Sequence, residues 1–400
     1  MNTRREFIKK SAFATAGSMM IPNFLKAYET QQMGLVQNTD KTLVIIQLSG
    51  GNDGLNTVVP YRNDLYYKAR PSISIKQDKV LKLNDEIGLN PSMGALRELY
   101  DNGLVSIINN VGYPNPDRSH FRSMDIWHTA SDSDEYLTTG WIGRYLDSSC
   151  QINCSPYKAL EIDDTLSLAL KGDKIKALST KDPAKLYKQV NNNFVERLSQ
   201  TKPVSEHENV SYLYKTLAET ASSAEVLHSK SKIYRSTGQY PQGELGQNLK
   251  TIAELIISGM PTNVYYVSIS GFDTHFNQVN QQNKLLENYA ESVKVFTEEL
   301  KRNNKLNDVV VMTFSEFGRR VKQNASGGTD HGTANNVFLI GGNLKRPAVL
   351  NEAPNLKNLD DGDLRFSVDF REIYASLLRN WLNVNDVAIL GKRFEGLKLV

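Results

Sequence analysis

Five apolar runs recur along the chain, and each is apolar on both faces, as in a strand buried at the centre of a parallel sheet. They predict strands over residues 41–49, 104–111, 263–269, 308–314 and 336–340. Apolar residues spaced three or four apart predict helices around them, over residues 92–102, 119–128, 277–303 and 369–381. Strands that alternate with helices predict an α/β fold of three αβα layers, with a mostly parallel central sheet and helices on both of its faces.

One long stretch departs from this alternation. Residues 183–259 show amphipathic helical spacing without any strand signal. We therefore expect one α/β domain over residues 41–400 that carries residues 183–259 as a helical insertion or cap.

The first 27 residues have the pattern of a targeting segment. The motif Arg4-Arg5-Glu6-Phe7-Ile8-Lys9 resembles a twin-arginine export signal, and a weakly apolar stretch leads from it to an expected cleavage point near Ala27. That stretch is much shorter than the roughly 20 apolar residues of a membrane-spanning helix. The pattern predicts export by the twin-arginine machinery to the periplasm or the cell exterior, with no transmembrane segment. A disordered basic tail is the alternative.

The net charge is best judged without this segment. The chain of 400 residues carries 47 Lys/Arg and 44 Asp/Glu, and the first 27 residues hold five of the bases and one of the acids. The remainder has 42 bases against 43 acids, a net charge of about −1. A nearly neutral protein has no general attraction for nucleic acid or anionic lipid, so neither is an expected partner.

The two cysteines, Cys150 and Cys154, are the only ones in the sequence. One such pair without nearby histidines makes a poor zinc site. A local disulfide and two free thiols both remain open, and we assign the pair no chemistry.

Acidic and imidazole side chains occur together in two glycine-containing turns next to predicted strands. Asp330 and His331 stand just before the run at 336–340, whereas Asp273 and His275 follow the run at 263–269. Carboxylate and imidazole ligands together suit zinc, manganese or iron, with calcium or magnesium as alternatives. Each turn can also be an ordinary hydrogen-bonded turn. Because the chain has only six histidines, we favour a shared metal or acid–base site.

Two further candidates stand at the ends of predicted strands. Asp53 lies in a glycine-rich turn after the first strand, where it is either a ligand or the cap of a helix. Glu316 ends the strand at 308–314 and is either a ligand or the partner of Arg319 or Arg320. Carboxylates in such positions lie where open α/β sheets bind ligands.

The segment Asp117-Arg118-Ser119-His120-Phe121-Arg122 has the composition of a catalytic turn. A serine at a helix N-terminus has backbone N–H groups beside it that stabilise an attacked oxyanion, and guanidinium groups hold phosphate or sulfate. Ser119, His120, Arg118 and Arg122 are therefore candidate catalytic residues. The alternatives are that Ser119 is only a helix cap and that Thr57 is the nucleophile.

These motifs together resemble an exported bacterial family called domain of unknown function 1501, over essentially the whole mature chain. The resemblance is carried by Leu-Ser-Gly-Gly-Asn-Asp-Gly-Leu-Asn-Thr (48–57), Arg-Ser-His-Phe (118–121), Gly-Trp-Ile-Gly-Arg-Tyr-Leu (140–146), Gly-Phe-Asp-Thr-His (271–275), Ser-Glu-Phe-Gly-Arg (315–319) and Gly-Thr-Asp-His-Gly (328–332). That family is similar to the alkaline phosphatase/sulfatase superfamily, which uses a two-metal α/β site.

The resemblance implies an alkaline-phosphatase-like fold and a division of the candidates into roles. It implies that Asp53, Asp330 and His331 hold one metal, that Asp273 and His275 hold a second, and that Ser119 is the nucleophile with Arg118 and Arg122 as oxyanion binders. The spacing of Asp273 and His275 is two rather than the superfamily's four, and no histidine follows His331. Glu316 or His120 is then the substitute ligand, or the second site is vacant.

Two functions follow from these expectations. The first is an exported metal-dependent hydrolase of phosphate or sulfate esters of a small molecule or a glycan. The second is a non-catalytic exported binding or assembly protein that keeps the fold with a degenerate metal site.

Overall fold

The computed structural model describes residues 41–149, 155–192, 195 and 208–400. The predicted signal segment, its cleavage point and the pair Cys150 and Cys154 lie outside these residues. The chain divides into two compact units, one within residues 182–233 and the other formed by residues 41–181 and 234–400. No helix among the described residues is long and apolar enough to cross a membrane.

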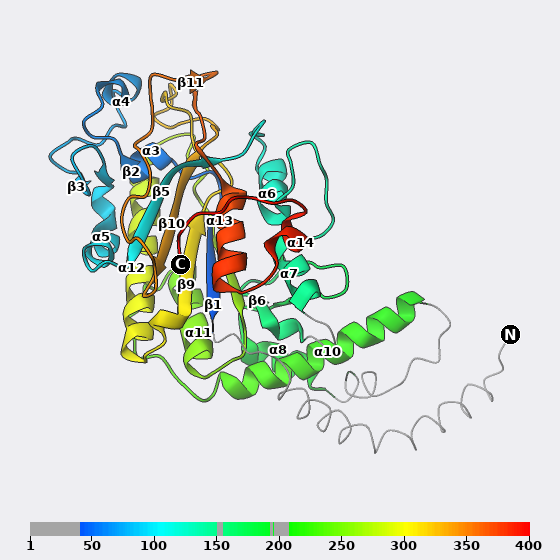
Figure 1. Ribbon diagram of the computed structural model, residues 1–400. Helices are drawn as coiled ribbons and strands as arrows, with labels where there is room; N and C mark the ends of the chain where they lie inside the picture. The colour runs from blue at the N-terminus through cyan, green and yellow to red at the C-terminus, as the bar shows by residue number, and fades with distance from the viewer. Residues whose placement is uncertain (1–40, 150–154, 193–194, 196–207) are drawn as a thin grey trace, which may run out of the picture. The chain divides into compact units, whose positions relative to one another are not determined.

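A mixed sheet of eight strands forms the centre of the larger unit (Figure 1). In spatial order its strands are β13 (Val368–Asp369), β5 (Val105–Gly112), β10 (Asn335–Gly341), β9 (Val309–Phe314), β1 (Thr42–Leu48), β8 (Val264–Ile269), β6 (Ala159–Glu161) and β7 (Leu178–Ser179). All pairs in it are parallel except those that β10 makes with β5 and β9. Every residue of β1, β5, β9 and β10 is buried, which explains their uninterrupted apolar sequences. The prediction of a mostly parallel sheet is confirmed.

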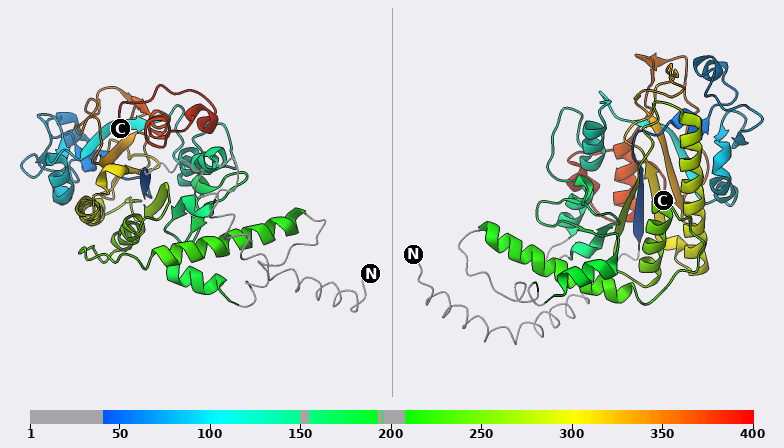
Figure 2. Two further views of the ribbon diagram at one scale, coloured as in Figure 1. Left: turned by 60° about the horizontal axis from the view of Figure 1, so that its bottom comes forward. Right: turned by 180° about the vertical axis from the view of Figure 1, so that it is seen from behind.

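Helices cover both faces of this sheet, as the views in Figure 2 show. The core on one face includes side chains of α6 (His120–Thr129), α7 (Trp141–Ser149), α13 (Phe370–Ser376) and α14 (Asp386–Leu390). The other face is covered by α5 (Gly94–Asp101), α11 (Glu244–Ile257) and α12 (Gln278–Arg302). Tyr289 of α12, for example, donates a hydrogen bond to Thr313 of β9. The predicted three-layer architecture is confirmed.

Shorter elements complete the larger unit. They are α3 (Gly54–Thr57), β2 (Val58–Val59), α4 (Asp64–Ala69), β3 (Leu81–Lys82), β4 (Gly88–Leu89), η1 (Pro91–Met93), η2 (Pro156–Lys158), η3 (Leu168–Leu170), η4 (Leu306–Asp308), β11 (Leu359–Asp360), β12 (Asp363–Leu364) and η5 (Leu377–Trp381), which continues α13 as a π-helix. Strands β2, β4 and β3 form a small antiparallel sheet, and β11 pairs with β12.

The predicted helical stretch 183–259 contains three helices in the described residues: α8 (Pro183–Val190), α10 (Glu208–Lys230) and α11. Helices α8 and α10 contact each other and belong to the smaller unit. Helix α11 belongs to the larger unit, where it contacts α12 and β8. The role of residues 183–259 as a cap stays a prediction.

A buried polar cluster lies between β1, β8 and α6. His128 Nε2 is 3.2 Å from Gln47 Oε1 and 3.1 Å from the Tyr266 hydroxyl, which also donates to Gln47 Oε1 at 2.5 Å. Burial lowers the pKa of His128 from 6.5 to about 4. His128 is therefore neutral in the folded protein at pH values where it is protonated in the unfolded chain.

His128 is expected to make folding stability depend on pH. Between the folded pKa near 4 and the unfolded pKa of 6.5, the unfolded state binds the extra proton, so stability rises with pH. This contribution is complete above pH 6.5 and is lost as pH falls toward 4, by up to about 3 kcal/mol. Urea unfolding of the wild type and of His128→Gln measures this contribution. The free energy of unfolding of the wild type, relative to that of His128→Gln, should increase from acidic to neutral pH. An advantage that is independent of pH would contradict this assignment.

Candidate metal centre

The loops that carry the candidate residues meet at one edge of the sheet. Strands β1, β5, β8 and β9 are parallel, so their carboxyl ends share this edge. Strand β10 is antiparallel to β5 and β9, and its amino end therefore lies at the same edge. This orientation brings Asp330 and His331, which precede a strand, to Asp273 and His275, which follow one.

Three imidazoles converge on one oxygen at this edge, Asp273 Oδ1. The Nε2 atom of His275 lies 3.0 Å from this oxygen, that of His331 lies 3.2 Å from it, and that of His120 lies 3.4 Å from it. The Nε2 atoms of His275 and His331 are 3.0 Å apart. Residues 120, 273, 275 and 331 come from three separate segments of the chain, so the cluster is a product of the tertiary fold.

Each of the three imidazoles faces an oxygen acceptor with its other nitrogen. Nδ1 of His120 is 2.9 Å from Glu316 Oε1, and Nδ1 of His331 is 2.8 Å from the Arg118 carbonyl oxygen. Nδ1 of His275 is 3.2 Å from Asp330 Oδ1. These acceptors favour the tautomer that has its proton on Nδ1, which leaves a lone pair on every Nε2. Histidines that bind metals typically have this second hydrogen bond.

Lone pairs that face a carboxylate oxygen repel it unless a cation lies between them. Arg319 supplies one positive charge, because its Nη2 is 2.7 Å from Asp273 Oδ1. Burial by itself would raise the pKa of Asp273, but the hydrogen bond and charge of Arg319 outweigh it, and the pKa is lowered to about 2. The hydrogen bond to Glu316 raises the pKa of His120, whereas burial lowers that of His331.

Arg319 also ties together the loops that carry the cluster. Its buried guanidinium donates to the carbonyl oxygens of Gly50, Gly51, Phe272 and Thr329. Gly50 has a φ of +117°, and a Cβ at this position would collide with the backbone of Asp273. Only glycine lets the loop after β1 pack against the loop that carries Asp273.

The donor set fits a divalent metal ion. Ligand atoms of His120, Asp273 and His331 all lie within 4.8 Å of one another. Ligands about 2.0–2.1 Å from a tetrahedral ion are roughly 3.3 Å apart, close to the separations around Asp273 Oδ1. The Nε2 atom of His120 is buried and has no hydrogen-bond partner within the described residues. An orphaned imidazole nitrogen aimed at a carboxylate is what a metal ligand looks like without its ion.

The structure gives Asp53, predicted as a metal ligand, other partners than the histidine cluster. Its carboxylate is fully buried and is 2.6 Å from the guanidinium of Arg70, which is equally buried. The same carboxylate accepts hydrogen bonds from the side chain of Gln278 and from the N–H of Leu55, as the cap of α3. Both oxygens of Asp53 are thus engaged by protein donors, whereas the carboxylate of Asp273 is half exposed and faces imidazoles.

Replacing Asp53 with asparagine tests this reading. Arg70 would be left buried without a counter-charge, so unfolding should become easier by about 3–5 kcal/mol. Bound metal per folded chain should stay at the wild-type value. Urea unfolding and elemental analysis, with the exposed Asp78→Asn as matched control, measure both quantities. Loss of metal at unchanged stability would return Asp53 to the ligand set.

Asp330 and Glu316, both predicted as ligands, lie one layer outward from the convergence point. Asp330 holds the Nδ1 side of His275 and accepts from Asn324 at 3.1 Å, and this hydrogen bond lowers its pKa. Glu316 is fully buried and accepts from the Gly50 N–H at 2.8 Å as well as facing His120. Both acids are therefore hydrogen-bond partners of histidines in the cluster.

Glu316→Gln is expected to weaken metal binding. Removing an outer partner of a ligand histidine costs about 10- to 100-fold in metal affinity. Competition with a chelator of known affinity measures the change, and Glu287→Gln, an exposed glutamate of α12, is the control. Wild-type affinity in Glu316→Gln would mean that His120 is not a ligand.

In the predicted catalytic segment 117–122, Arg118 and His120 contact the cluster, whereas Arg122 has other partners. Ser119 is exposed, precedes His120 directly and caps α6 without a side-chain hydrogen bond, so its hydroxyl is not used for capping. The guanidinium of Arg118 pairs with Asp363 and Asp361. The buried guanidinium of Arg122 donates to the carbonyl oxygens of residues 132, 133 and 135.

Thr57, the alternative nucleophile, is fully buried. Its hydroxyl donates to the Asp53 carbonyl oxygen at 2.8 Å. A hydroxyl in this environment has no access to a substrate, which leaves Ser119 as the candidate.

Two contributors to the site were not predicted from the sequence. The sequence indicates Arg319 only as a partner of Glu316, and it does not mark Phe317 as a site residue. The Phe317 ring packs 4.8 Å from the rings of both His120 and His331. The available signal was the motif that holds Glu316, which places Phe317 and Arg319 directly after a buried strand.

The chain is similar in sequence to one protein family. The sequence profile of the family described as "Protein of unknown function (DUF1501)" matches residues 40–381. No curated protein matches the chain.

Several solved structures are similar to it. The lipoteichoic acid synthase LtaP from Listeria monocytogenes is 11% identical, with 86% of this chain and 72% of that chain covered and a TM-score of 0.40. A protein in the alkaline phosphatase superfamily from Vibrio parahaemolyticus is 8% identical, with 88% of this chain and 69% of that chain covered and a TM-score of 0.38. PsFucS1 sulfatase from Pseudoalteromonas sp. is 8% identical, with 97% of this chain and 74% of that chain covered and a TM-score of 0.40.

Proposed function

The chain belongs to the family described as protein of unknown function DUF1501, and from its site we propose an exported, metal-dependent hydrolase of phosphate or sulfate esters that uses Ser119 as nucleophile. One observation carries the proposal: three Nε2 atoms converge on Asp273 Oδ1, and each imidazole is oriented by an acceptor at Nδ1. The mixed imidazole and carboxylate set favours zinc, manganese or iron. When bound, such an ion supplies Lewis acidity toward the ester oxygens and promotes deprotonation of a nearby hydroxyl.

The residues of the chain would divide the remaining work. Glu316, Asp330 and the Arg118 carbonyl oxygen hold the histidines in one tautomer and orientation. Ser119 stands at the N-terminus of the ten-residue helix α6, whose first N–H groups have no acceptor within the helix. These groups and the helix dipole favour the negative charge of a phosphate or sulfate beside Ser119.

In the proposed reaction, the Ser119 oxygen attacks phosphorus or sulfur and gives up its proton to solvent. The bond to the alcohol oxygen breaks, and the alcohol leaves with the bonding electron pair and takes up a proton from water. A water molecule then hydrolyses the Ser119 ester, which releases phosphate or sulfate and restores the serine. The side chain of Arg118, 41% exposed, would bind the transferred group by exchanging its ion pairs with Asp361 and Asp363 for the phosphate or sulfate oxygens.

A hydrolysis screen tests the proposal. Mature protein purified without chelator is assayed with 4-nitrophenyl phosphate and 4-nitrophenyl sulfate, after chelation, and after addition of zinc, manganese or iron. We expect turnover of one ester that chelation abolishes and one of the metals restores. No turnover of either ester with any of the metals would contradict the assignment.

A specific observation favours the second candidate, a non-catalytic exported binding or assembly protein. Asp53 and Asp273 are each paired with a buried arginine. In the two-metal arrangement that the resemblance implies, each of these acids holds a metal ion, but here a guanidinium already lies beside each of them. A protein that binds metal tightly yet hydrolyses no ester would support this candidate.

Export and periplasmic or extracellular localisation are part of the proposal and rest on the twin-arginine motif at residues 4–9. Fractionation of cells that produce the Arg4-Arg5→Lys-Lys variant tests them. Retention of the unprocessed variant inside the cell is expected.

A further inference from the structure

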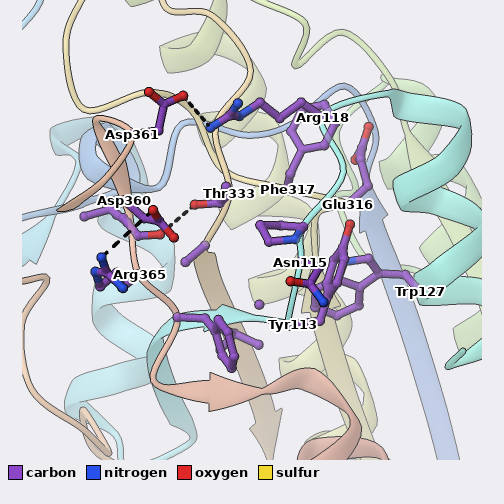
Figure 3. A pocket seen from close by; sticks show the side chains of 16 residues that line it. Tyr113, Asn115, Arg118, Trp127, Glu316, Phe317, Thr333, Asp360, Asp361 and Arg365 are labelled. Atoms are coloured by element: carbon purple, nitrogen blue, oxygen red, sulfur yellow. Dashed lines mark hydrogen bonds and ion pairs between the residues drawn. The ribbon is translucent and has the colours of Figure 1, made fainter. Parts of the chain in front are cut away.

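A cavity of about 370 Å³ adjoins the metal centre (Figure 3). Glu316, Phe317 and Arg118 line this cavity. Glu316 also contacts His120, and the Phe317 ring contacts both His120 and His331. The carbonyl oxygen of Arg118 contacts His331. A group bound in the cavity is thus next to the site where the ester would be cleaved. The volume lies near the lower end of the roughly 300–1,000 Å³ of small-molecule sites.

Aromatic side chains form much of the wall. Tyr113, Phe317, Phe366 and Trp127 all line the cavity. Phe366 is 38% exposed, although it is a large apolar side chain. Trp127 is only 2% exposed, and its Nε1–H has no hydrogen-bond partner within the described residues. The two faces of its indole ring stack on Phe314 and Phe370, so Trp127 is a fixed part of the wall.

The rim adds charged groups of both signs. Asp360 and Asp361 of the β11–β12 hairpin are carboxylates that only accept hydrogen bonds, whereas Arg118 and Arg365 only donate (Figure 3). A ligand that satisfies both kinds must donate and accept at several points, which a set of hydroxyl groups does. The aromatic walls meanwhile require apolar C–H faces. A hydrocarbon chain would cover the ion pairs Arg118–Asp361 and Arg365–Asp360 without hydrogen bonding to them, at a cost in affinity.

We propose that this cavity binds a carbohydrate ring, the polyhydroxylated part of the ester. The inference rests on the proposed function for its link to hydrolysis, but binding of the carbohydrate itself needs no catalysis. Aromatic side chains cover the C–H face of the ring, and Asp360 and Arg365 bind hydroxyls at the rim.

Direct binding tests the proposal. Saturation-transfer NMR and tryptophan fluorescence of the mature protein are recorded with glucose, galactose, mannose and cellobiose as unesterified probes. We expect saturable binding of at least one sugar, weakened at least about tenfold in the double variant Asp360→Asn/Arg365→Ala. The matched control is Arg97→Ala/Asp101→Asn, an exposed ion pair of α5 that should bind like the wild type.

The outcomes separate this inference from the proposed function. Sugar binding that the double variant loses supports the cavity assignment even if no ester is hydrolysed. Hydrolysis of nitrophenyl esters without any saturable sugar binding overturns the cavity assignment and leaves the hydrolase proposal intact. Binding that is unchanged in the double variant also overturns it, because the sugar then binds elsewhere.

Discussion

Asp273→Asn is expected to lose bound metal and ester hydrolysis together. Asp273 Oδ1 is the atom on which three imidazoles converge, and an amide in its place lacks the negative charge that holds a cation there. Loss of an outer partner costs about 10- to 100-fold in metal affinity, so loss of a direct ligand should cost more than about 100-fold. Elemental analysis, chelator competition and turnover of the active nitrophenyl ester measure the effect.

The fold should survive this change, since the Asp273 side chain is half exposed and the asparagine oxygen still accepts from Arg319. Circular dichroism and urea unfolding check this, with the exposed Asp78→Asn variant as control. A folded Asp273→Asn protein with wild-type metal content would remove Asp273 from the site.

Ser119→Ala is expected to abolish turnover while metal content stays at the wild-type level. Removal of a nucleophile costs at least about 10³-fold in kcat, and the Ser119 hydroxyl makes no capping hydrogen bond whose loss would destabilise α6. Initial rates and elemental analysis of the same preparation give both numbers.

The matched control for this variant is Ser229→Ala, at an exposed serine of α10. Full activity in Ser119→Ala would assign the nucleophile elsewhere. Loss of metal together with activity would show that Ser119 supports the ligand set rather than the chemical step.

The buried strands were predictable because their sequences carry the signal directly. Strands β1, β5, β8, β9 and β10 begin and end within a few residues of the five apolar runs. Each run is apolar on both faces because helices cover both faces of the sheet. The direction of a strand has no such signature, and the antiparallel orientation of β10 could not be seen in the sequence.

The metal centre was predictable in part for a related reason. Histidine is scarce in this chain, so His275 and His331 beside acidic residues were informative, and the cluster contains both. Which acids belong to the cluster could not be predicted in the same way, because an acid after a strand has the same sequence context whether it binds a metal or pairs with an arginine. Asp53 pairs with Arg70, 17 residues later, and Asp273 with Arg319, 46 residues later.

The central claim is that His120, His331 and Asp273 hold one divalent metal ion, and anomalous X-ray diffraction tests it most directly. Crystals of protein purified without chelator would be measured at the zinc, manganese and iron absorption edges. We predict one peak about 2.0–2.2 Å from His120 Nε2, His331 Nε2 and Asp273 Oδ1. A peak beside Asp53 instead, or no peak at this cluster in crystals soaked with each metal, would contradict the account.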